Sequence, residues 1–273
     1  MQASVIISTY NSPLWLEKVL EGYAHQSRKD FEVLIADDGS DNRTKEVIES
    51  FKDRLTQIKH IWHPDQGFQK CKILNKAIKH AETEYLIFTD GDCIPRSDFV
   101  ATHLKYRKKR RFLSGGYFKL PMELSQTIDA QDIESQKCFN LSWLKDHGLG
   151  TSFKNFKLAS NPRVTHFLNK LTPTNPTWNG DNASGWKKDI LAVNGFDERM
   201  RYGGEDRELG ERLINNQIYP IQIRYKAICV HLDHKRGYVT EEDWEKNNQI
   251  RRQTLRNRAC WTPFGIFQSA MAR

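Results

Sequence analysis

The chain has 273 residues, a formal net charge of +8 at pH 7 and a hydrophobic fraction of 38%. A chain of this length buries roughly three quarters of its unfolded surface, which excludes disorder throughout. No apolar stretch approaches the roughly 20 residues that span a bilayer. The N-terminal segment MQASVIISTYN has no basic region, so it predicts a buried strand rather than a signal peptide. The positive charge indicates anionic partners, such as nucleotides, phosphorylated substrates or an acidic membrane surface.

The cysteines are odd in number and widely spaced, and no two of them form a Cys-x-x-Cys pair. They are Cys71, Cys93, Cys138, Cys229 and Cys260. This pattern argues against a disulfide framework and against a cysteine-based zinc site. We therefore expect a reducing, cytoplasmic setting.

The first hundred residues alternate short apolar runs with helical patterns. We predict strands at residues 4–8, 31–36, 59–62 and 85–89. The first helix is expected to begin at Ser12-Pro13, because proline is tolerated in the first turn. Apolar residues at a spacing of 3.6 follow each of the first three strands; they are Leu16, Val19, Leu20, Tyr23, Ala24, Val47, Ile48, Phe51, Ile73, Leu74, Ala77, Ile78 and Ala81. This alternation predicts an α/β fold with a Rossmann-like, mostly parallel central sheet flanked by helices.

The second half of the chain is less regular. Residues 140–180 are rich in Asn, Thr, Ser and Pro, and we expect a long irregular connection there. A helix is predicted after the acidic segment 203–206, and a strand at 227–230 ends next to His231. The last thirty residues mix arginines with aromatic side chains.

Asp90-Gly91-Asp92 directly follows the fourth predicted strand. Residues i and i+2 of an extended segment point the same way, so both carboxylates face one bound object. Mg²⁺ and Mn²⁺ prefer carboxylate and phosphate oxygens, which favours a divalent ion that carries a diphosphate. The alternative is a solvated Asp-Gly turn. The position of this segment at a strand end favours the metal site, because ligands of parallel sheets bind beyond the carboxyl ends of the strands.

Two further acidic clusters have the same double interpretation. Asp37-Asp38 ends the second predicted strand, where it is either a polar turn before a helix or a pair that holds a nucleotide base and its ribose. Glu205-Asp206 precedes a helix, where acidic groups complement the positive helix end. In a cleft, one of these two carboxylates acts instead as a general base on an alcohol.

Other candidate residues are basic or aromatic. His231 follows a buried strand and suits a metal ligand beside the carboxylate pair, with His234 as a competitor. Lys72, like Lys70, lies after Gly67 on a predicted helix and is expected to face a diphosphate. Trp186 and Trp178 flank residues 179–182, and an aromatic face there suits a sugar ring. The run of residues 105–111 is either a solvated helix end or an attraction site for phosphoryl groups or membranes.

The order of the motifs STYN, ADDGS, DGD, NGFDE–GGED and a strand-end histidine resembles the family 2 inverting glycosyltransferases of the GT-A fold. The resemblance covers roughly residues 3–235. The segment that begins WNGDNASGW and ends GGEDRELGERL is similar to the acceptor-side block of chondroitin polymerases and β-1,4-galactosyltransferases.

This resemblance implies a role for each matching position. It implies that the uracil and ribose are held by Thr9, Asp37 and Asp38, and that Asp90 contacts ribose or metal. It makes Asp92 the main metal ligand and His231 the second. It makes Asp206 the catalytic base and Glu205 the acceptor-binding neighbour. It places Asp181 and Asn182 against the donor sugar and acceptor; Trp186 remains our aromatic candidate for the acceptor.

The implied function is metal-dependent transfer, with inversion, of a hexose or N-acetylhexosamine from a UDP-sugar to a saccharide or glycolipid acceptor, with Mn²⁺ or Mg²⁺ as cofactor. The resemblance also implies a role in bacterial surface polysaccharide or lipopolysaccharide synthesis. We divide the chain into a nucleotide-sugar-binding half (1–115), an acceptor-binding and catalytic half of the same GT-A domain (116–240) and a helical, basic-aromatic tail (241–273). The basic run and this tail motivate peripheral contact with an anionic membrane.

Three alternatives remain at this point. A sugar-nucleotide-forming nucleotidyltransferase is expected to carry a glycine- and basic-rich phosphate loop near the N-terminus, which STYNSPLW lacks. A non-catalytic nucleic-acid-binding protein is suggested by the charge, but the acidic clusters would repel phosphates and no aromatic recognition motif accompanies the basic run. A dehydrogenase is disfavoured because no G-x-G-x-x-G follows the first strand. We therefore expect no nucleic-acid partner.

Overall fold

The computed structural model describes residues 1–55, 57–158, 162–171, 173–234 and 240–267. The first half alternates strands and helices in the predicted order: β1 (Ala3–Thr9), α1 (Pro13–Ala24), β2 (Phe31–Asp37), α2 (Asn42–Ser50), β3 (Ile58–Trp62), α3 (Lys70–His80) and β4 (Tyr85–Asp90). β1 pairs in parallel with both β2 and β4, and β2 pairs in parallel with β3. The predicted parallel βαβ arrangement is therefore confirmed.

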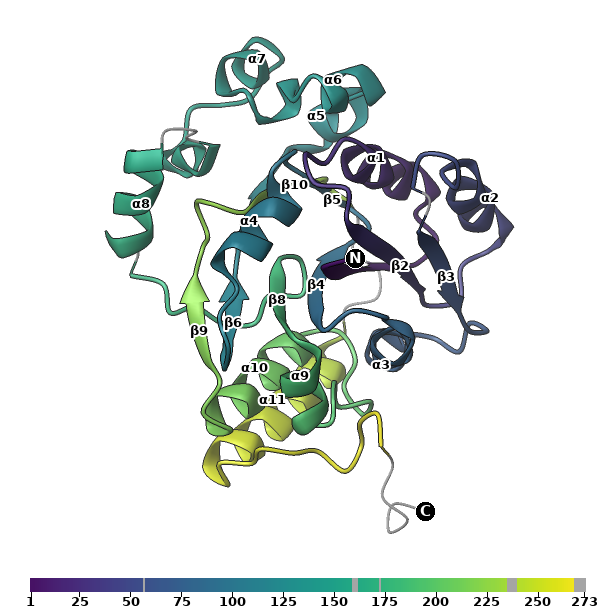
Figure 1. Cartoon of the computed structure of the whole chain (residues 1–273), viewed down its shortest axis with the longest axis vertical. Helices are drawn as coiled ribbons and strands as arrows, with labels where there is room; N and C mark the ends of the chain where they lie inside the picture. The colour runs from purple at the N-terminus through teal and green to yellow at the C-terminus, as the bar shows by residue number, and fades with distance from the viewer. Residues whose placement is uncertain (56, 159–161, 172, 235–239, 268–273) are drawn as a thin grey trace.

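The second half completes this sheet and adds a smaller one. Its elements are β5 (Cys93–Pro95), α4 (Phe99–Tyr106), β6 (Arg111–Ser114), β7 (Gly116–Lys119), α5 (Met122–Thr127), α6 (Ala130–Glu134), η1 (Lys137–Phe139), α7 (Leu141–Asp146), η2 (Phe153–Leu158), α8 (Pro162–Leu171), β8 (Ala183–Trp186), α9 (Lys187–Ala192), α10 (Glu205–Asn215), β9 (Tyr219–Gln222), β10 (Ile228–His231) and α11 (Glu241–Arg256). The main sheet has the order β3-β2-β1-β4-β8-β6-β9, and the small sheet has the order β5-β10-β7 (Figure 1).

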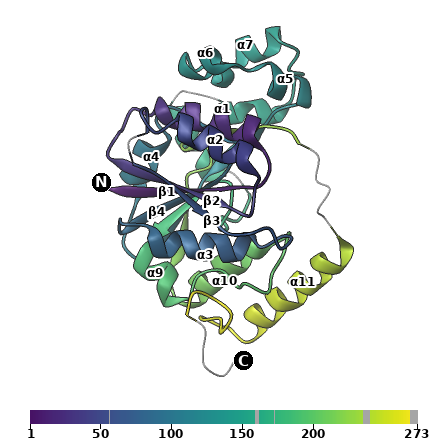
Figure 2. The same ribbon diagram turned by 90° about the vertical axis from the view of Figure 1, so that its right-hand side faces the viewer.

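Helices cover both faces of the main sheet. Figure 2 shows α1 and α2 on one face and α3, α9 and α10 on the other. Successive side chains of a strand point to opposite faces of the sheet and so contribute to both buried clusters. Val5 and Ile7 belong to one cluster, and Ile6 belongs to the other. The sequences of these strands are therefore continuous apolar runs, as expected for a sheet that is buried on both faces.

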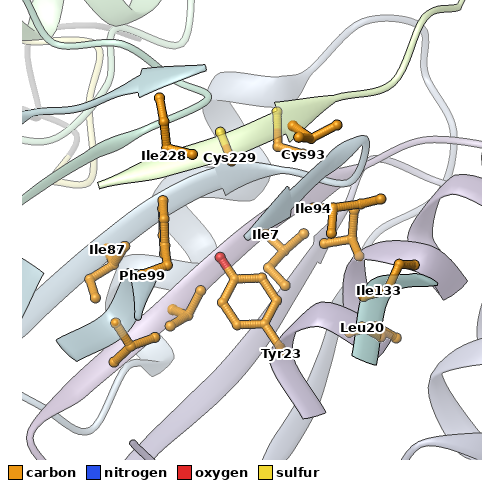
Figure 3. Close-up of a cluster of buried hydrophobic side chains, with 14 of the residues drawn as sticks. Ile7, Leu20, Tyr23, Ile87, Cys93, Ile94, Phe99, Ile133, Ile228 and Cys229 are labelled. Atoms are coloured by element: carbon orange, nitrogen blue, oxygen red, sulfur yellow. The ribbon is translucent and has the colours of Figure 1, made fainter. Parts of the chain in front are cut away.

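The small sheet is anchored to the main body by the core in Figure 3. Side chains of α1, β4, α4, β5 and β10 meet there around Tyr23. The Tyr23 ring makes edge-on contacts with Phe31 and Phe99, at centroid distances of 6.2 and 6.4 Å. Because β5 directly follows Asp92 and β10 ends at His231, this packing fixes the backbone that carries both residues.

The expectation of an irregular connection over residues 140–180 was wrong, because α7, η2 and α8 lie within it. Asn140 begins α7 by accepting a hydrogen bond from the Trp143 amide, and Leu144 is buried beneath it. The basic run also differs from a single helix end: α4 stops at Tyr106 and Arg111 begins β6.

The C-terminal segment packs on the domain rather than extending from it. α11 runs against α10, and its Ile250 side chain is buried in the second apolar cluster. Among the described residues, no helix combines the length and the apolar composition that crossing a membrane requires.

Candidate active site

A cleft of about 740 Å³ opens where β1, β2 and β4 end. This is the edge of a parallel sheet at which ligands are expected. Eight of the predicted site residues line it: Thr9, Asp38, Asp90, Asp92, Asp181, Glu205, Asp206 and His231. The acidic clusters that are far apart in the sequence therefore belong to one site.

Gly91 lets the Asp90–Asp92 segment cross β1 closely. Its amide donates to the Ser8 carbonyl at 2.7 Å. A Cβ at position 91 would lie 3.0 Å from the Ser8 carbonyl oxygen and 3.1 Å from Thr9 Oγ1. Such contacts are tighter than ordinary packing, so glycine is what permits this crossing. The crossing places the two carboxylates on either side of Gly91 at the cleft.

Asp92, His231 and His234 form a cluster of potential metal ligands. Their nearest nitrogen and oxygen atoms all lie within 4.8 Å of one another. Nε2 of His234 is 2.9 Å and Nε2 of His231 is 3.7 Å from Asp92 Oδ2. Both imidazoles therefore face the same carboxylate.

The protonation of this cluster suits a cation. Nδ1 of His231 lies 2.7 Å from the Leu232 carbonyl, and a carbonyl only accepts, so Nδ1 carries a proton and Nε2 is the nitrogen that faces Asp92. Burial opposes ionisation of Asp92, but the hydrogen bond from His234 and the charge of His231 hold the pKa of this carboxyl group below its ordinary value. A carboxylate and two imidazoles form a donor set that fits Mn²⁺ better than Mg²⁺, which prefers oxygen ligands throughout.

Lys70 supplies a partly buried positive charge in the lining of the cleft. Its Nζ donates to Asp90 Oδ1 at 2.7 Å, and the Ser8 hydroxyl donates to the same oxygen at 2.5 Å. Burial alone would lower the pKa of Lys70, but the charges of Asp90 and Glu205 hold it well above the ordinary value. Lys70 is therefore a permanent cation between the β4 carboxylate and the acidic start of α10.

The wall of the cleft at the ends of β1 and β2 carries Asp38 and Thr9. Asp38 lines the cleft, accepts from His63 Nε2 at 2.7 Å and from the Gln69 amide at 2.8 Å, and burial raises its pKa. Thr9 also lines the cleft, and its buried Oγ1 has no hydrogen-bond partner among the described residues. A buried hydroxyl without a partner at a cleft wall is available to a ligand.

The opposite wall carries Glu205 and Asp206 at the start of α10. Asp206 Oδ2 accepts from the Gly180 amide at 2.9 Å, which aims this carboxylate at the cleft. Glu205 turns back and accepts from the Gly203 amide at 2.9 Å. Burial, followed by the charge of Asp206, raises the pKa of Glu205 to about 7. The two neighbouring carboxylates therefore have different surroundings, as expected from their divergence on a helix.

Asp181 faces the same space from the segment before β8. Burial raises its pKa to about 8, and the charges of Asp90 and Asp206 act in the same direction. The metal-free cleft thus keeps at least one carboxyl group protonated near neutral pH, because several anionic groups share a region with limited solvent.

Four predicted residues do not line the cleft, and we correct their placement. Asp37 is fully buried, where it accepts from the Ser40 amide and from His60. Asn182 is fully buried and donates to the Gly116 and Ala227 carbonyls, so it ties the two sheets together.

Lys72 and Trp186 are the other two. Lys72 is exposed, and the cleft is lined by Lys70 from the opposite side of α3 instead. Trp186 lies opposite Tyr85 at the start of β4, whereas the cleft is at the end of this strand, and its Nε1 donates to the Lys108 carbonyl. An acceptor in the cleft therefore does not touch it.

The sequence analysis missed the support that α11 gives to the loop of residues 201–203, directly before α10. Asn247 is fully buried, and its amide group donates to the carbonyls of residues 201, 202 and 203 at 2.9, 3.2 and 3.1 Å. A Cβ at Gly203 would lie 2.9 Å from Trp244, which also lines the cleft. No local pattern marks these residues, since their partners lie about forty positions away.

Comparison with known proteins now places this cleft in a family. Residues 4–150, more than half of the chain, match the model for glycosyl transferase family 2. The chain belongs to this family. The resemblance seen in the sequence is therefore confirmed, and it favours a glycosyltransferase over the nucleotidyltransferase and the nucleic-acid-binding protein.

The curated relatives are glycosyltransferases of greater length. The chain is 29% identical over 247 residues to validoxylamine A glucosyltransferase of Streptomyces hygroscopicus, covering 86% of this chain and 56% of that protein. It is 27% identical over 240 residues to chondroitin synthase of Escherichia coli, covering 79% of this chain and 32% of that protein. It thus spans about half or less of the length of these relatives.

Solved structures show the same GT-A fold. Residues 1–349 of TarS from Staphylococcus aureus, in complex with UDP-GlcNAc, superpose with a TM-score of 0.63 at 19% identity, covering 92% of this chain and 65% of that one. A mannosyltransferase from Pyrobaculum calidifontis, in complex with GDP-Man and Mn²⁺, gives a TM-score of 0.59 at 20% identity, covering 87% and 58%. The predicted fold class, a GT-A fold with a mostly parallel central sheet flanked by helices, is therefore confirmed.

Proposed function

We propose that this family 2 chain is a metal-dependent, inverting glycosyltransferase that moves a hexose or N-acetylhexosamine from a UDP-sugar to a hydroxyl of a saccharide acceptor. The observation that carries the proposal is the composition of the two cleft walls. One wall holds the Asp92–His231–His234 cluster beside Asp90, and the other holds Asp206. A donor diphosphate and an acceptor hydroxyl need groups of these two kinds on opposite sides of one sugar.

The donor is assigned to the wall formed by β1, β2 and β4. Asp38 and the free hydroxyl of Thr9 supply polar contacts for a nucleoside, and Lys70 with Asp90 lies deeper in the cleft. The chemistry that a divalent ion at Asp92, His231 and His234 supplies is stabilisation of negative charge on a departing diphosphate. TarS, solved in complex with UDP-GlcNAc, supports the choice of a uridine nucleotide.

The acceptor is assigned to the wall at the start of α10. The Gly180 and Arg207 amides each donate to one oxygen of Asp206 and hold this carboxylate at the cleft, where it removes the proton of the acceptor hydroxyl as a general base. A single displacement of this kind inverts the anomeric centre. Glu205, held by the Gly203 amide, shapes the acceptor side.

The biological setting of the proposal is the cytoplasmic assembly of a bacterial surface polysaccharide or lipopolysaccharide. All five cysteines lie in the described part of the chain as free thiols, which supports a reducing compartment. Chondroitin synthase and the poly(ribitol-phosphate) β-N-acetylglucosaminyltransferase TarS, both similar to this chain, build or decorate polymers according to their names. A glycolipid acceptor would bring the enzyme to a membrane surface.

A donor panel tests the proposal. In the presence of Mn²⁺, we expect the chain to hydrolyse one UDP-sugar or to transfer its sugar to an acceptor. This activity should be lost in a chelator and return when Mn²⁺ is restored. NMR of the product would show inversion at the anomeric carbon. Turnover of a GDP-sugar in place of every UDP-sugar would overturn the donor class, and undiminished turnover in the chelator would overturn the metal.

A further inference from the structure

Four large apolar residues of η2 and α8 are more than half exposed to solvent. Phe153 is 81% exposed, Phe156 is 52% exposed, and Phe167 and Leu171 are each 61% exposed. Phe167 and Leu171 are four positions apart and so lie on one side of α8, whereas Thr165 is buried. A helix of a globular domain normally turns its apolar stripe to the core. We call these four residues the η2–α8 apolar face.

The four residues belong to one stretch of surface. Phe153 and Phe156 make an edge-on ring contact at 5.1 Å. Only three positions separate η2 from α8, so the end of one and the start of the other are at most about 15 Å apart. α8 lies at the outer edge of the molecule, at the left in Figure 1. The apolar face is therefore accessible to a large, flat partner.

The charged side chains in the sequence around η2 and α8 are all basic. Residues 147–180 contain four Lys and Arg (Lys154, Lys157, Arg163 and Lys170) and no Asp or Glu. Lys154 is exposed between the two phenylalanines of η2. Aromatic and leucine side chains among basic residues, without acidic ones, are typical of segments that lie in the interface of an anionic bilayer. A second copy of this chain, which is basic as well, lacks the complementary charge.

We propose that the η2–α8 apolar face docks this protein on an anionic lipid membrane. This location differs from the basic run at residues 105–111 and from the C-terminal tail, where the sequence suggested membrane contact. The proposal does not depend on the proposed transferase activity, because lipid binding is measured without a substrate.

The docking face is connected to the cleft through η2. Lys157, on η2, donates through Nζ to the Tyr117 carbonyl at 2.9 Å, and Tyr117 lines the cleft. The ammonium group also lies 5.0 Å from the centre of the Tyr117 ring. A protein that rests on lipid through η2 and α8 therefore holds the wall of its cleft near the membrane surface.

Vesicle flotation tests the proposal with the full chain. We expect binding to vesicles enriched in phosphatidylglycerol and little binding to phosphatidylcholine alone. Phe167→Ser combined with Leu171→Ser should weaken binding at least about tenfold, since two apolar side chains no longer enter the interface. Lys154→Glu should weaken binding to anionic vesicles and make its loss with salt shallower, since less attraction is left for salt to screen.

Matched controls separate this face from other surfaces. Leu255, an exposed leucine of α11, lies outside the cleft lining, and Leu255→Ser should bind as the parent does. Lys109→Glu tests the basic run. Far-ultraviolet circular dichroism and thermal melting should match among all variants, because every changed side chain is exposed.

Four results would overturn the proposal. The first is absence of binding to anionic vesicles, and the second is equal binding by the parent and the Phe167/Leu171 variant. The third is a dimer by light scattering that this variant abolishes while vesicle binding stays unchanged, which would assign the face to a second copy of the chain. A loss with Lys109→Glu and none with Lys154→Glu would return membrane contact to the basic run.

Discussion

Lys70 Nζ lies 2.7 Å from Asp90 Oδ1, so the first residue of α3 neutralises the last residue of β4. The same ammonium group acts on Glu205 and Asp206 across the cleft. A Cβ placed on Gly180 would lie 3.6 Å from it and 3.8 Å from Asp206 Oδ2, which shows how closely the two walls approach. One partly buried cation thus connects the carboxylates of the two cleft walls.

Removal of this cation should impair turnover. Lys70→Met should lower kcat/KM for the donor by about ten- to hundredfold, the cost of a lost charged hydrogen bond. Lys72→Met is the matched control, since Lys72 is an exposed lysine of the same helix, and it should stay within about twofold of the parent. Steady-state kinetics with a UDP-sugar measure both. The reverse order of effects would place the diphosphate at Lys72.

The metal cluster predicts equal importance of its two histidines. Asp92→Ala should abolish Mn²⁺-dependent UDP binding, and His231→Ala and His234→Ala should each weaken Mn²⁺ binding at least about tenfold. Calorimetry with Mn²⁺, with and without UDP, measures these changes. His80→Ala is the control, because His80 is exposed at the end of α3. Parental Mn²⁺ affinity in His234→Ala would leave His231 as the ligand and His234 as a neighbour.

Local pattern was sufficient to predict β1 to β4, β10 and the two acidic strand ends. The apolar runs of β1, β2 and β4 are continuous because both faces of the sheet are covered. Asp90-Gly91-Asp92 and Asp38 follow such runs directly, so their place at the cleft follows from the direction of the parallel strands.

Prediction failed where the position of a side chain depends on where a helix begins, which sets the side of the helix it lies on, or on contacts with residues distant in the sequence. Lys70 and Lys72 are two positions apart, which turns them about 200° from each other on a helix, and the start of α3 was not known. Asn182 and Trp186 follow the cleft residues in sequence, but β8 runs antiparallel to β4 and carries them into the sheet and away from the site. Asn247 acts through carbonyls of a loop more than forty residues away.

The division of labour between Asp206 and Glu205 predicts distinct kinetic defects. Asp206→Asn keeps an oxygen that accepts the Gly180 hydrogen bond but cannot take a proton, so turnover should fall about 10²–10⁴-fold with donor affinity retained. Glu205→Gln should mainly raise the KM of the acceptor. Donor affinity by calorimetry is the control for folding. A near-parental kcat in Asp206→Asn, with a lost kcat in Glu205→Gln, would reverse the two roles.

The raised pKa of Asp181, about 8, makes the stability of the metal-free protein fall as the pH rises. Burial and the charge of Asp90 disfavour its ionised form, whereas in the unfolded chain this carboxyl group ionises near its ordinary value of 3.8. Between these values the folded chain holds the extra proton, so the free energy of unfolding drops by up to about 1.4 kcal/mol per pH unit for this group. Glu205, with a pKa of about 7, adds to the drop below neutral pH. Urea denaturation in a chelator between about pH 5 and pH 8 should show this slope, and Asp181→Asn should flatten it, because the amide carries no titrating proton. A slope that Asp181→Asn leaves unchanged would contradict the assignment of the proton to this residue.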